Sequence, residues 1–395
     1  MKKNKTGRKN VTVQRYPELL RQNPKIKIAH IAGGLTTGGV EAVIYNYFSL
    51  MNQRDYELYY ISYDKPNREV QRRFENAGFH VYEVCKKKDH FFRSCMQVLK
   101  ILREHDIQIV HSHMTLICFV TSFLGWICGI RVRVAHSHLA QHITGPKRWI
   151  YAIFKLLTRV TSTHYVACGR EAAVYLYGQK LVDQGKVMVM HNAIDTGKFE
   201  FCQETRMRMR KHLSLEGRFC VGHVGRFTEQ KNHGFLIDIF LEIRKRKDNA
   251  VLLLLGEGEL ESQIRDKVKR LSLEEHVIFA GSRSDIDQFY QAMDVFLMPS
   301  LYEGLAVSLV EVQCNGIPIV VSDTVTEEIH LAKAYKILSL SDSPDIWAEA
   351  VCAWEPSGEE GCVSRSEARN LVEKAGYDIT REAQKLDDFY KTAVG

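Results

Sequence analysis

The chain alternates short apolar runs with amphipathic segments from residue 25 to its end. The run at 25–32 (KIKIAHIA) stops at Gly33 and Gly34, and a helical pattern begins near Gly39. Ten further apolar runs follow, at 58–62, 107–111, 132–136, 163–167, 186–190, 220–224, 250–255, 277–280, 295–298 and 318–321. Apolar runs separated by helical segments are typical of parallel strands that are buried on both faces. The pattern therefore predicts an α/β protein.

This number of strands fits two sheets better than one, and a length of 395 residues fits two domains of ordinary size. We place the linker between the domains at about 195–206. The predicted N-terminal domain is 25–198, and the predicted C-terminal domain is 199–376. In doubly wound sheets, ligands bind beyond the carboxyl ends of the strands. Two such domains would present these ends to one cleft.

The longest apolar stretch is 116–130, which at 15 residues is shorter than the roughly 20 that a membrane-spanning helix needs. It predicts a helix buried behind a sheet.

Charge divides the chain unevenly. The net charge of +7 results from +8 in residues 1–27, +7 in 28–200 and −8 in 201–395. A basic first half predicts an anionic partner, which could be nucleic acid, an acidic substrate or an anionic membrane. Residues 1–24 are expected to form a flexible basic tail. Ten cysteines without a C-x-x-C pair, and no apolar run near the start, predict a cytoplasmic location.

Three segments carry the features of anion-binding loops. The first, GGLTTGGVE, contains Gly38 and Gly39 between a strand and a helix. In the second, 220–240, a strand is followed by Gly225, Arg226 and Lys231 before the next helix begins. A helix N-terminus attracts anions, and the two cations could hold a diphosphate between them.

The third segment, 298–323, has Glu303 after a strand and Glu311 eight residues further on. Gly304, Leu305 and Ala306, followed by Val307, would offer backbone N–H groups to a phosphate. Carboxylates at such positions accept hydrogen bonds from vicinal sugar hydroxyls. A separate G-x-G in 252–264 lacks the third glycine of a dinucleotide fingerprint.

Four histidines follow two of the predicted strands, at His111, His113, His136 and His138. Zinc is conceivable, but neither cysteine nor carboxylate completes a ligand set, so we predict no metal site. His136 is singled out because it ends a strongly β-branched strand. Asp285 and Asp287 form a D-x-D sequence, which we interpret as the start of a helix with Ser284 or Asp285 as its N-cap.

Five runs occur along residues 25–392 in the order known from one enzyme family: GGVE, VAHSH, VGRFTEQKN, GEGEL and EGLAVSLVE. In this the chain resembles retaining glycosyltransferases of family 4, and among them the bacterial enzymes that build capsule or exopolysaccharide. The resemblance implies a GT-B fold, with two Rossmann-like domains that face a central cleft. It also implies that 377–395 forms a helix that crosses back to the N-terminal domain. The sequence HNAID at 191–195 departs from the family's common N-G-I-D.

The resemblance also implies roles for individual residues. Gly38 and Gly39 would approach the donor phosphates or the acceptor, and His136 would lie beside the transferring sugar. The remaining positions would bind the donor: Arg226 and Lys231 with Gly225 at the diphosphate, Glu303 at the sugar hydroxyls, Gly304, Leu305, Ala306 and Val307 at phosphate, Glu311 at the ribose, and Gly281 and Arg283 beside the base.

The expected reaction transfers a hexose or N-acetylhexosamine from a nucleotide sugar, with UDP favoured over GDP. No cofactor or metal is expected, because cations and helix dipoles would stabilise the leaving diphosphate. Residues 86–105 and 145–159 mix cations with aromatic and aliphatic residues at helical spacing. We therefore expect a peripheral position on the anionic inner face of the plasma membrane, with a polyprenyl-diphosphate-linked or oligosaccharide acceptor.

Three alternatives stand beside this interpretation. A GT-B sugar-nucleotide epimerase would share the fold, but the paired glutamates at 303 and 311 argue against it. A silent partner subunit would be expected to lack Arg226, Lys231 or Glu303, and all three are present. A nucleic-acid binder would suit the basic tail, but the sequence carries no stacking-aromatic motif, so no nucleic-acid partner is expected.

Overall fold

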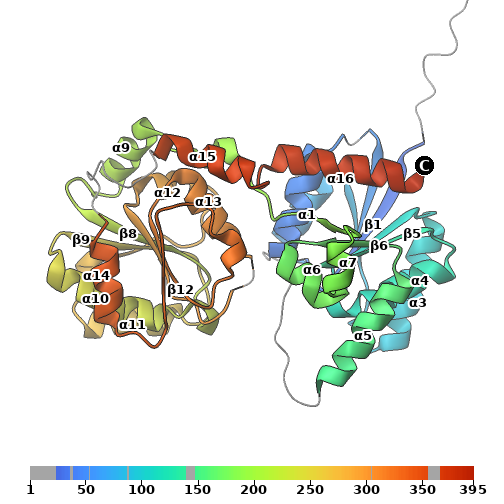
Figure 1. Cartoon of the computed structure of the whole chain (residues 1–395), viewed down its shortest axis with the longest axis horizontal. Helices are drawn as coiled ribbons and strands as arrows, with labels where there is room; N and C mark the ends of the chain where they lie inside the picture. The colour runs from blue at the N-terminus through green and yellow to red at the C-terminus, as the bar shows by residue number, and fades with distance from the viewer. Residues whose placement is uncertain are drawn as a thin grey trace, which may run out of the picture.

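The computed structural model describes residues 24–35, 39–52, 54–86, 89–138, 147–303, 305–354 and 365–395. They form two α/β domains, each built on one parallel sheet, which lie side by side in Figure 1. The predicted α/β class and the two sheets are confirmed.

The N-terminal sheet has seven strands in the order β3-β2-β1-β4-β5-β6-β7. Their bounds are β1 Ile26–Ala32, β2 Tyr56–Ser62, β3 Phe79–Glu83, β4 Ile109–Ser112, β5 Val132–Ser137, β6 His164–Ala167 and β7 Val187–Val189. The helices of this domain are α1 Gly39–Leu50, α2 Arg68–Asn76, α3 Phe91–Glu104, α4 Cys118–Ile127, α5 Lys147–Thr161, α6 Arg170–Tyr177 and α7 Gln179–Asp183. Separate apolar clusters cover the two faces of the sheet.

The C-terminal sheet has six strands in the order β10-β9-β8-β11-β12-β13. Their bounds are β8 Phe219–Val224, β9 Ala250–Leu255, β10 Val277–Phe279, β11 Val295–Met298, β12 Ile319–Ser322 and β13 Tyr335–Leu338. The helices that follow β7 are α8 Thr196–Phe199, α9 Gln203–His212, α10 His233–Arg246, α11 Glu261–Arg270, α12 Ile286–Ala292, α13 Val307–Asn315, α14 Pro344–Cys352, α15 Arg365–Lys374 and α16 Ile379–Val394.

Two strands were missed by the sequence analysis. Each of them, β3 and β13, is an edge strand of its sheet, and every side chain of the two strands except that of Phe79 is partly or fully exposed. A half-exposed strand has no continuous apolar run, so the criterion that found the central strands does not detect it.

The chain crosses between the domains at two adjacent points. Ile194 and Asp378 form an isolated parallel bridge there. The expected linker at 195–206 is not a linker, because it contains α8 and the start of α9, and Phe199 lies in the C-terminal core. After the second crossing, α16 packs against α1 and buries Leu386 and Tyr390 in the N-terminal core (Figure 1).

The helix expected at 116–130 is only half buried. α4 buries Leu124 but leaves Phe123, Trp126 and Ile127 between 41% and 61% exposed. Within the described ranges, no helix is both long and apolar enough to cross a bilayer.

Candidate active site

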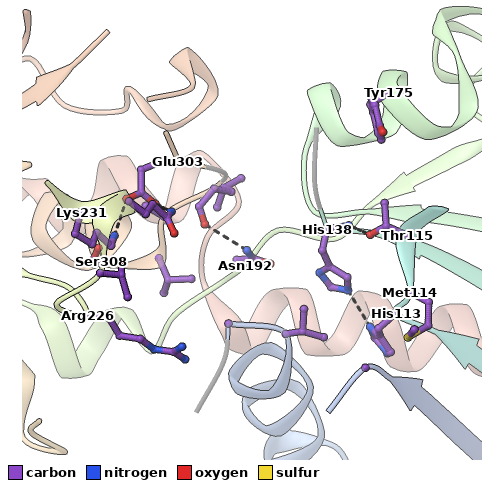
Figure 2. A pocket seen from close by; sticks show the side chains of 18 of the residues that line it. His113, Met114, Thr115, His138, Tyr175, Asn192, Arg226, Lys231, Glu303 and Ser308 are labelled. Carbon is purple, nitrogen blue, oxygen red and sulfur yellow. Dashed lines mark hydrogen bonds and ion pairs between the residues drawn. The ribbon is translucent and has the colours of Figure 1, made fainter. Parts of the chain in front are cut away.

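A cleft of about 760 Å³ separates the two domains at the carboxyl ends of their strands. The N-terminal domain contributes His113, Thr115, His138 and Tyr175, together with the turn from β1 into α1. From the C-terminal domain, Arg226, Lys231, Glu303 and the start of α13 face them across the cleft (Figure 2). The topology thus assembles one site from segments far apart in the sequence.

The loop after β8 is held in place by close backbone packing. A Cβ on Gly225 would lie 2.9 Å from the Lys231 side chain, and a Cβ on Gly256 would lie 2.1 Å from the Gly225 carbonyl oxygen. Position 256 therefore requires glycine, whereas a side chain at Gly225 would displace the side chain of Lys231. Gly225 leaves room for the stem of Lys231, so its contribution to the site is indirect.

Several hydrogen bonds fasten this loop to the segment after β11. The Leu301 N–H donates to the Gln230 carbonyl at 2.8 Å, and the Asn232 amide donates to the Pro299 carbonyl at 3.1 Å. Lys231 Nζ lies 2.7 Å from Glu303 Oε1, and both side chains are largely buried. The predicted diphosphate cation and the predicted sugar-binding carboxylate thus form one ion pair.

The N-terminus of α13 opens onto the same side of the cleft. Leu305, Ala306 and Val307 line it, as does Ser308, which the sequence analysis did not single out. The N-cap residue is Ala306, whose side chain cannot accept the first helical N–H groups. With Arg226 exposed nearby, this region attracts an anion. Gly304 lies outside the described residues.

The structure keeps several predicted donor-binding residues away from the described cleft lining. Glu311 accepts a hydrogen bond from Tyr290 at 2.8 Å, and burial raises the pKa of its carboxyl to about 7. Arg283 makes a bidentate pair with Asp285, with both N···O distances 2.9 Å. Gly281 adopts φ +69° and accepts from the Gly256 N–H through its carbonyl.

Both carboxylates of the D-x-D sequence form ion pairs with basic side chains. Asp285 occupies the N-cap position of α12, as predicted, although its side chain pairs with Arg283 and makes no capping hydrogen bond. The hydrogen bonds from Arg283 lower the pKa of Asp285. Asp287 lies 3.3 Å from Lys198.

His138, and not His136, lines the cleft. His136 is still within β5 and is fully buried, with its ring against the rings of His111, His113 and His138. His138 lies beyond the strand end and reaches the cleft (Figure 2). His136 is thus not among the residues that line the cleft, and its place beside the transferring sugar stays a prediction. Gly39 begins α1 at the cleft, and Gly38 lies outside the described residues.

Five imidazoles gather at the ends of β1, β4 and β5. His30 was not among the histidines singled out from the sequence, and it pairs with His111 in the register of β1 and β4. Two sets of three have ring nitrogens within 4.8 Å of one another and could hold a metal ion: His30, His111 and His113, and His113, His136 and His138. A further histidine, His30, completes the first set without cysteine or carboxylate, and the absence of a metal stays a prediction. Burial lowers the pKa of all five rings, to about 3 for His30 and about 4 for His138.

Contacts across the cleft were also invisible to the sequence analysis. The Asn192 amide donates to the Leu305 carbonyl at 3.5 Å. Glu328 accepts from the backbone N–H of Arg170, at 2.9 Å, and from that of Glu171, at the start of α6. A glycine precedes this helix, because a Cβ on Gly169 would meet the Glu328 carboxylate.

Known proteins match almost the whole described chain. The model of Glycosyltransferase Family 4 matches residues 37–198, and that of Glycosyl transferases group 1 matches residues 205–369. EpsF of Bacillus subtilis, named as a glycosyltransferase, is 28% identical over 380 residues, covering 93% of this chain and 97% of EpsF. A second relative, from Escherichia coli, is 23% identical over 379 residues, covering 93% of this chain and 97% of the relative. It is named UDP-Gal:α-D-GlcNAc-diphosphoundecaprenol α-1,3-galactosyltransferase.

Among solved structures, Anabaena HepE in complex with UDP superimposes with a TM-score of 0.76 at 17% identity. The match covers 93% of this chain and all of HepE. This likeness establishes the fold, in which two Rossmann-like domains face each other. The chain is therefore a glycosyltransferase of the GT-B fold, made of a family 4 domain followed by a group 1 domain.

Proposed function

We propose that the protein is a retaining glycosyltransferase that takes a hexose or N-acetylhexosamine from a UDP-sugar. The acceptor would be a polyprenyl-diphosphate-linked or oligosaccharide chain in cell-surface polysaccharide synthesis. The UDP of the HepE complex and the diphosphoundecaprenol in the name of the Escherichia coli relative support this choice.

One observation carries the proposal. Arg226, Lys231 and the open N-terminus of α13 converge on one side of the cleft, next to Glu303. Arg226 suits a phosphate because its guanidinium binds two oxygens at once, and Lys231 supplies a compact charge. The Glu303 carboxylate accepts hydrogen bonds from sugar hydroxyls. Such a set fits a diphosphate that is joined to a sugar.

In the proposed reaction the bond between the anomeric carbon and the diphosphate oxygen breaks, and the sugar gains positive character. The acceptor oxygen attacks on the same face, and its proton passes to a diphosphate oxygen. The enzyme's main task is to stabilise the developing negative charge, which Arg226, Lys231 and α13 can do from fixed positions. No protein nucleophile is assigned, and the cations take the part that a metal plays in other transferases.

A donor screen with product analysis tests the proposal. The protein is incubated with several UDP- and GDP-sugars and a polyprenyl-diphosphate sugar acceptor. NMR of the product should show a new glycosidic bond with the donor's anomeric configuration. An inverted configuration would refute the retaining mechanism, and an isomerised free nucleotide sugar without transfer would indicate the epimerase.

A basic, apolar surface supports a position at the membrane. Phe92 of α3, Trp126 of α4 and Trp149 of α5 are between 61% and 83% exposed, and the three helices lie together on the N-terminal domain (Figure 1). Further exposed apolar side chains flank them: Phe91, Met96, Phe123, Ile127, Ile150, Ile153, Leu156, Leu157 and Val160. Arg93, Lys100, Arg131 and Arg148 are exposed on the same elements or beside them. We propose that this surface binds anionic lipid.

Flotation with phosphatidylglycerol vesicles tests the surface. The variant with both Phe92→Ser and Trp149→Ser should bind several-fold more weakly, because apolar insertion is lost. Met207→Ser is the control, since Met207 is also an exposed apolar residue, at 59%, but lies on the C-terminal domain. Deletion of residues 1–24 measures the contribution of the basic tail. If the intact protein ignores these vesicles at low salt, the membrane proposal fails and a soluble acceptor becomes the better choice.

A further inference from the structure

A hydrogen-bonded chain of three imidazoles leads from the N-terminal core to the cleft. His30 Nδ1 lies 3.0 Å from His113 Nε2, and His113 Nδ1 lies 2.9 Å from His138 Nε2. The inner end, His30 Nε2, is buried without a hydrogen-bond partner among the described residues. At the outer end, the bond to His113 leaves Nδ1 of His138 as the nitrogen on the cleft side (Figure 2).

The N–H hydrogens on the rings of these three histidines can be counted. Burial keeps the three rings neutral, so together they carry three ring hydrogens. Two of these hydrogens are used in the two N···N hydrogen bonds. The third must lie at one end, either on His30 Nε2 in the core or on His138 Nδ1 at the cleft. All three rings therefore share one direction of donation.

The position of the third hydrogen follows from its surroundings. On His30 Nε2 it would be a buried N–H without an acceptor, which is rare in folded proteins. On His138 Nδ1 it can be donated to water or substrate. We propose that His30 and His113 are positioning residues that fix the tautomer of His138, so that its Nδ1–H is a hydrogen-bond donor to the cleft.

This assignment gives His138 a definite role within the proposed function, on which it rests. A neutral imidazole with hydrogen on Nδ1 offers the cleft a donor and no base. It can therefore hold a hydroxyl or phosphate oxygen of the nucleotide sugar, but it cannot accept the proton of the acceptor. This agrees with a reaction in which that proton passes to the diphosphate.

A second chain provides a matched control. His136 Nδ1 lies 3.1 Å from His111 Nε2, and His111 Nδ1 lies 2.5 Å from the Tyr390 hydroxyl. His136 is as buried as His30, and its Nε2 also lacks a partner within the described structure. Its ring stacks on His138 with centroids 4.0 Å apart, but the two share no hydrogen bond among the described contacts. Replacing His136 therefore disturbs the packing of His138 without breaking the three-ring chain.

The test is ¹⁵N NMR of the full-length protein labelled in the histidine rings, with the His138 signals identified by their loss in His138→Asn. The wild type should show His138 with hydrogen on Nδ1 by about tenfold or more over Nε2. His113→Leu should reduce this preference severalfold, because it removes the N–H donor to His138 Nε2, and His136→Leu should leave it unchanged.

Three results would overturn the proposal. They are a wild-type His138 with hydrogen mainly on Nε2, an unchanged preference in His113→Leu, and a stoichiometric zinc ion that EDTA removes, since zinc would take the same nitrogens. The wild-type spectrum alone decides the first of these if a variant fails to fold. The measurement needs no substrate, so its outcome is independent of the donor screen.

Discussion

Replacing Lys231 by methionine removes one charge and keeps most of the volume of the side chain. Lys231 Nζ lies 2.7 Å from Glu303 Oε1, and the side chains of Lys231 and Glu303 are only 15% and 6% exposed. The substitution therefore removes a cation from the diphosphate site. It also leaves the Glu303 carboxylate with one weaker side-chain hydrogen bond, from Gln230 at 3.3 Å.

Both effects have an expected size. The loss of one preorganised charge commonly lowers kcat by about 10²–10³-fold, or roughly 2.7–4 kcal/mol. A buried charge left without its partner costs about 3–5 kcal/mol of folding stability. We therefore expect Lys231→Met to be both slow and less stable, as measured by steady-state kinetics and thermal unfolding.

Two further variants separate these effects. Lys231→Met combined with Glu303→Gln removes both charges, so it should recover most of the stability but none of the activity. Lys245→Ala breaks an ion pair of 2.6 Å with Glu242 at the surface of the same domain, where such pairs contribute about 0–1 kcal/mol. Normal kcat in Lys231→Met would refute the assignment, and recovery of activity in the double variant would reduce Lys231 to a partner of Glu303.

Three other outcomes follow from the same structure. Arg226→Ala should weaken UDP binding and slow transfer by about 10²-fold, and wild-type kinetics would contradict its role. Activity should survive EDTA, and loss with rescue by Mn²⁺ would revive Asp285 and Asp287 as ligands. The raised pKa of Glu311, about 7, means that the folded state binds its proton more tightly than the unfolded state, so this contribution to stability is full below pH 4.5 and is lost as pH rises through 7. Glu311→Gln should flatten that part of the profile of unfolding temperature against pH.

Much of the fold was predictable because its central strands are buried on both faces. Runs such as Ala250–Leu255 are continuously apolar, and this one was found with its exact bounds. The loop with Arg226 and Lys231 was found because glycine and cations follow a strand and precede a helix. For these segments the local sequence pattern was enough to predict where they lie in the fold.

The histidine cluster and the choice of the histidine at the cleft could not be predicted, because they depend on contacts between segments distant in the sequence. His30 stands alone in its strand, and only the pairing of β1 with β4 brings it to the other imidazoles. His136 and His138 have the same local pattern, and the end of β5 decides which one reaches the cleft. The exposed face of α4 was missed because an apolar helix has the same composition whether it is covered by protein or by another partner.

The most direct test of the account is a crystal structure of the protein with UDP. The diphosphate should lie in the cleft, within hydrogen-bond distance of Arg226, Lys231 and the backbone N–H groups at the start of α13. The Lys231–Glu303 pair should persist or open toward the ligand. A nucleotide bound elsewhere, or a diphosphate that contacts neither cation, would contradict the central claim that this cleft binds the sugar donor.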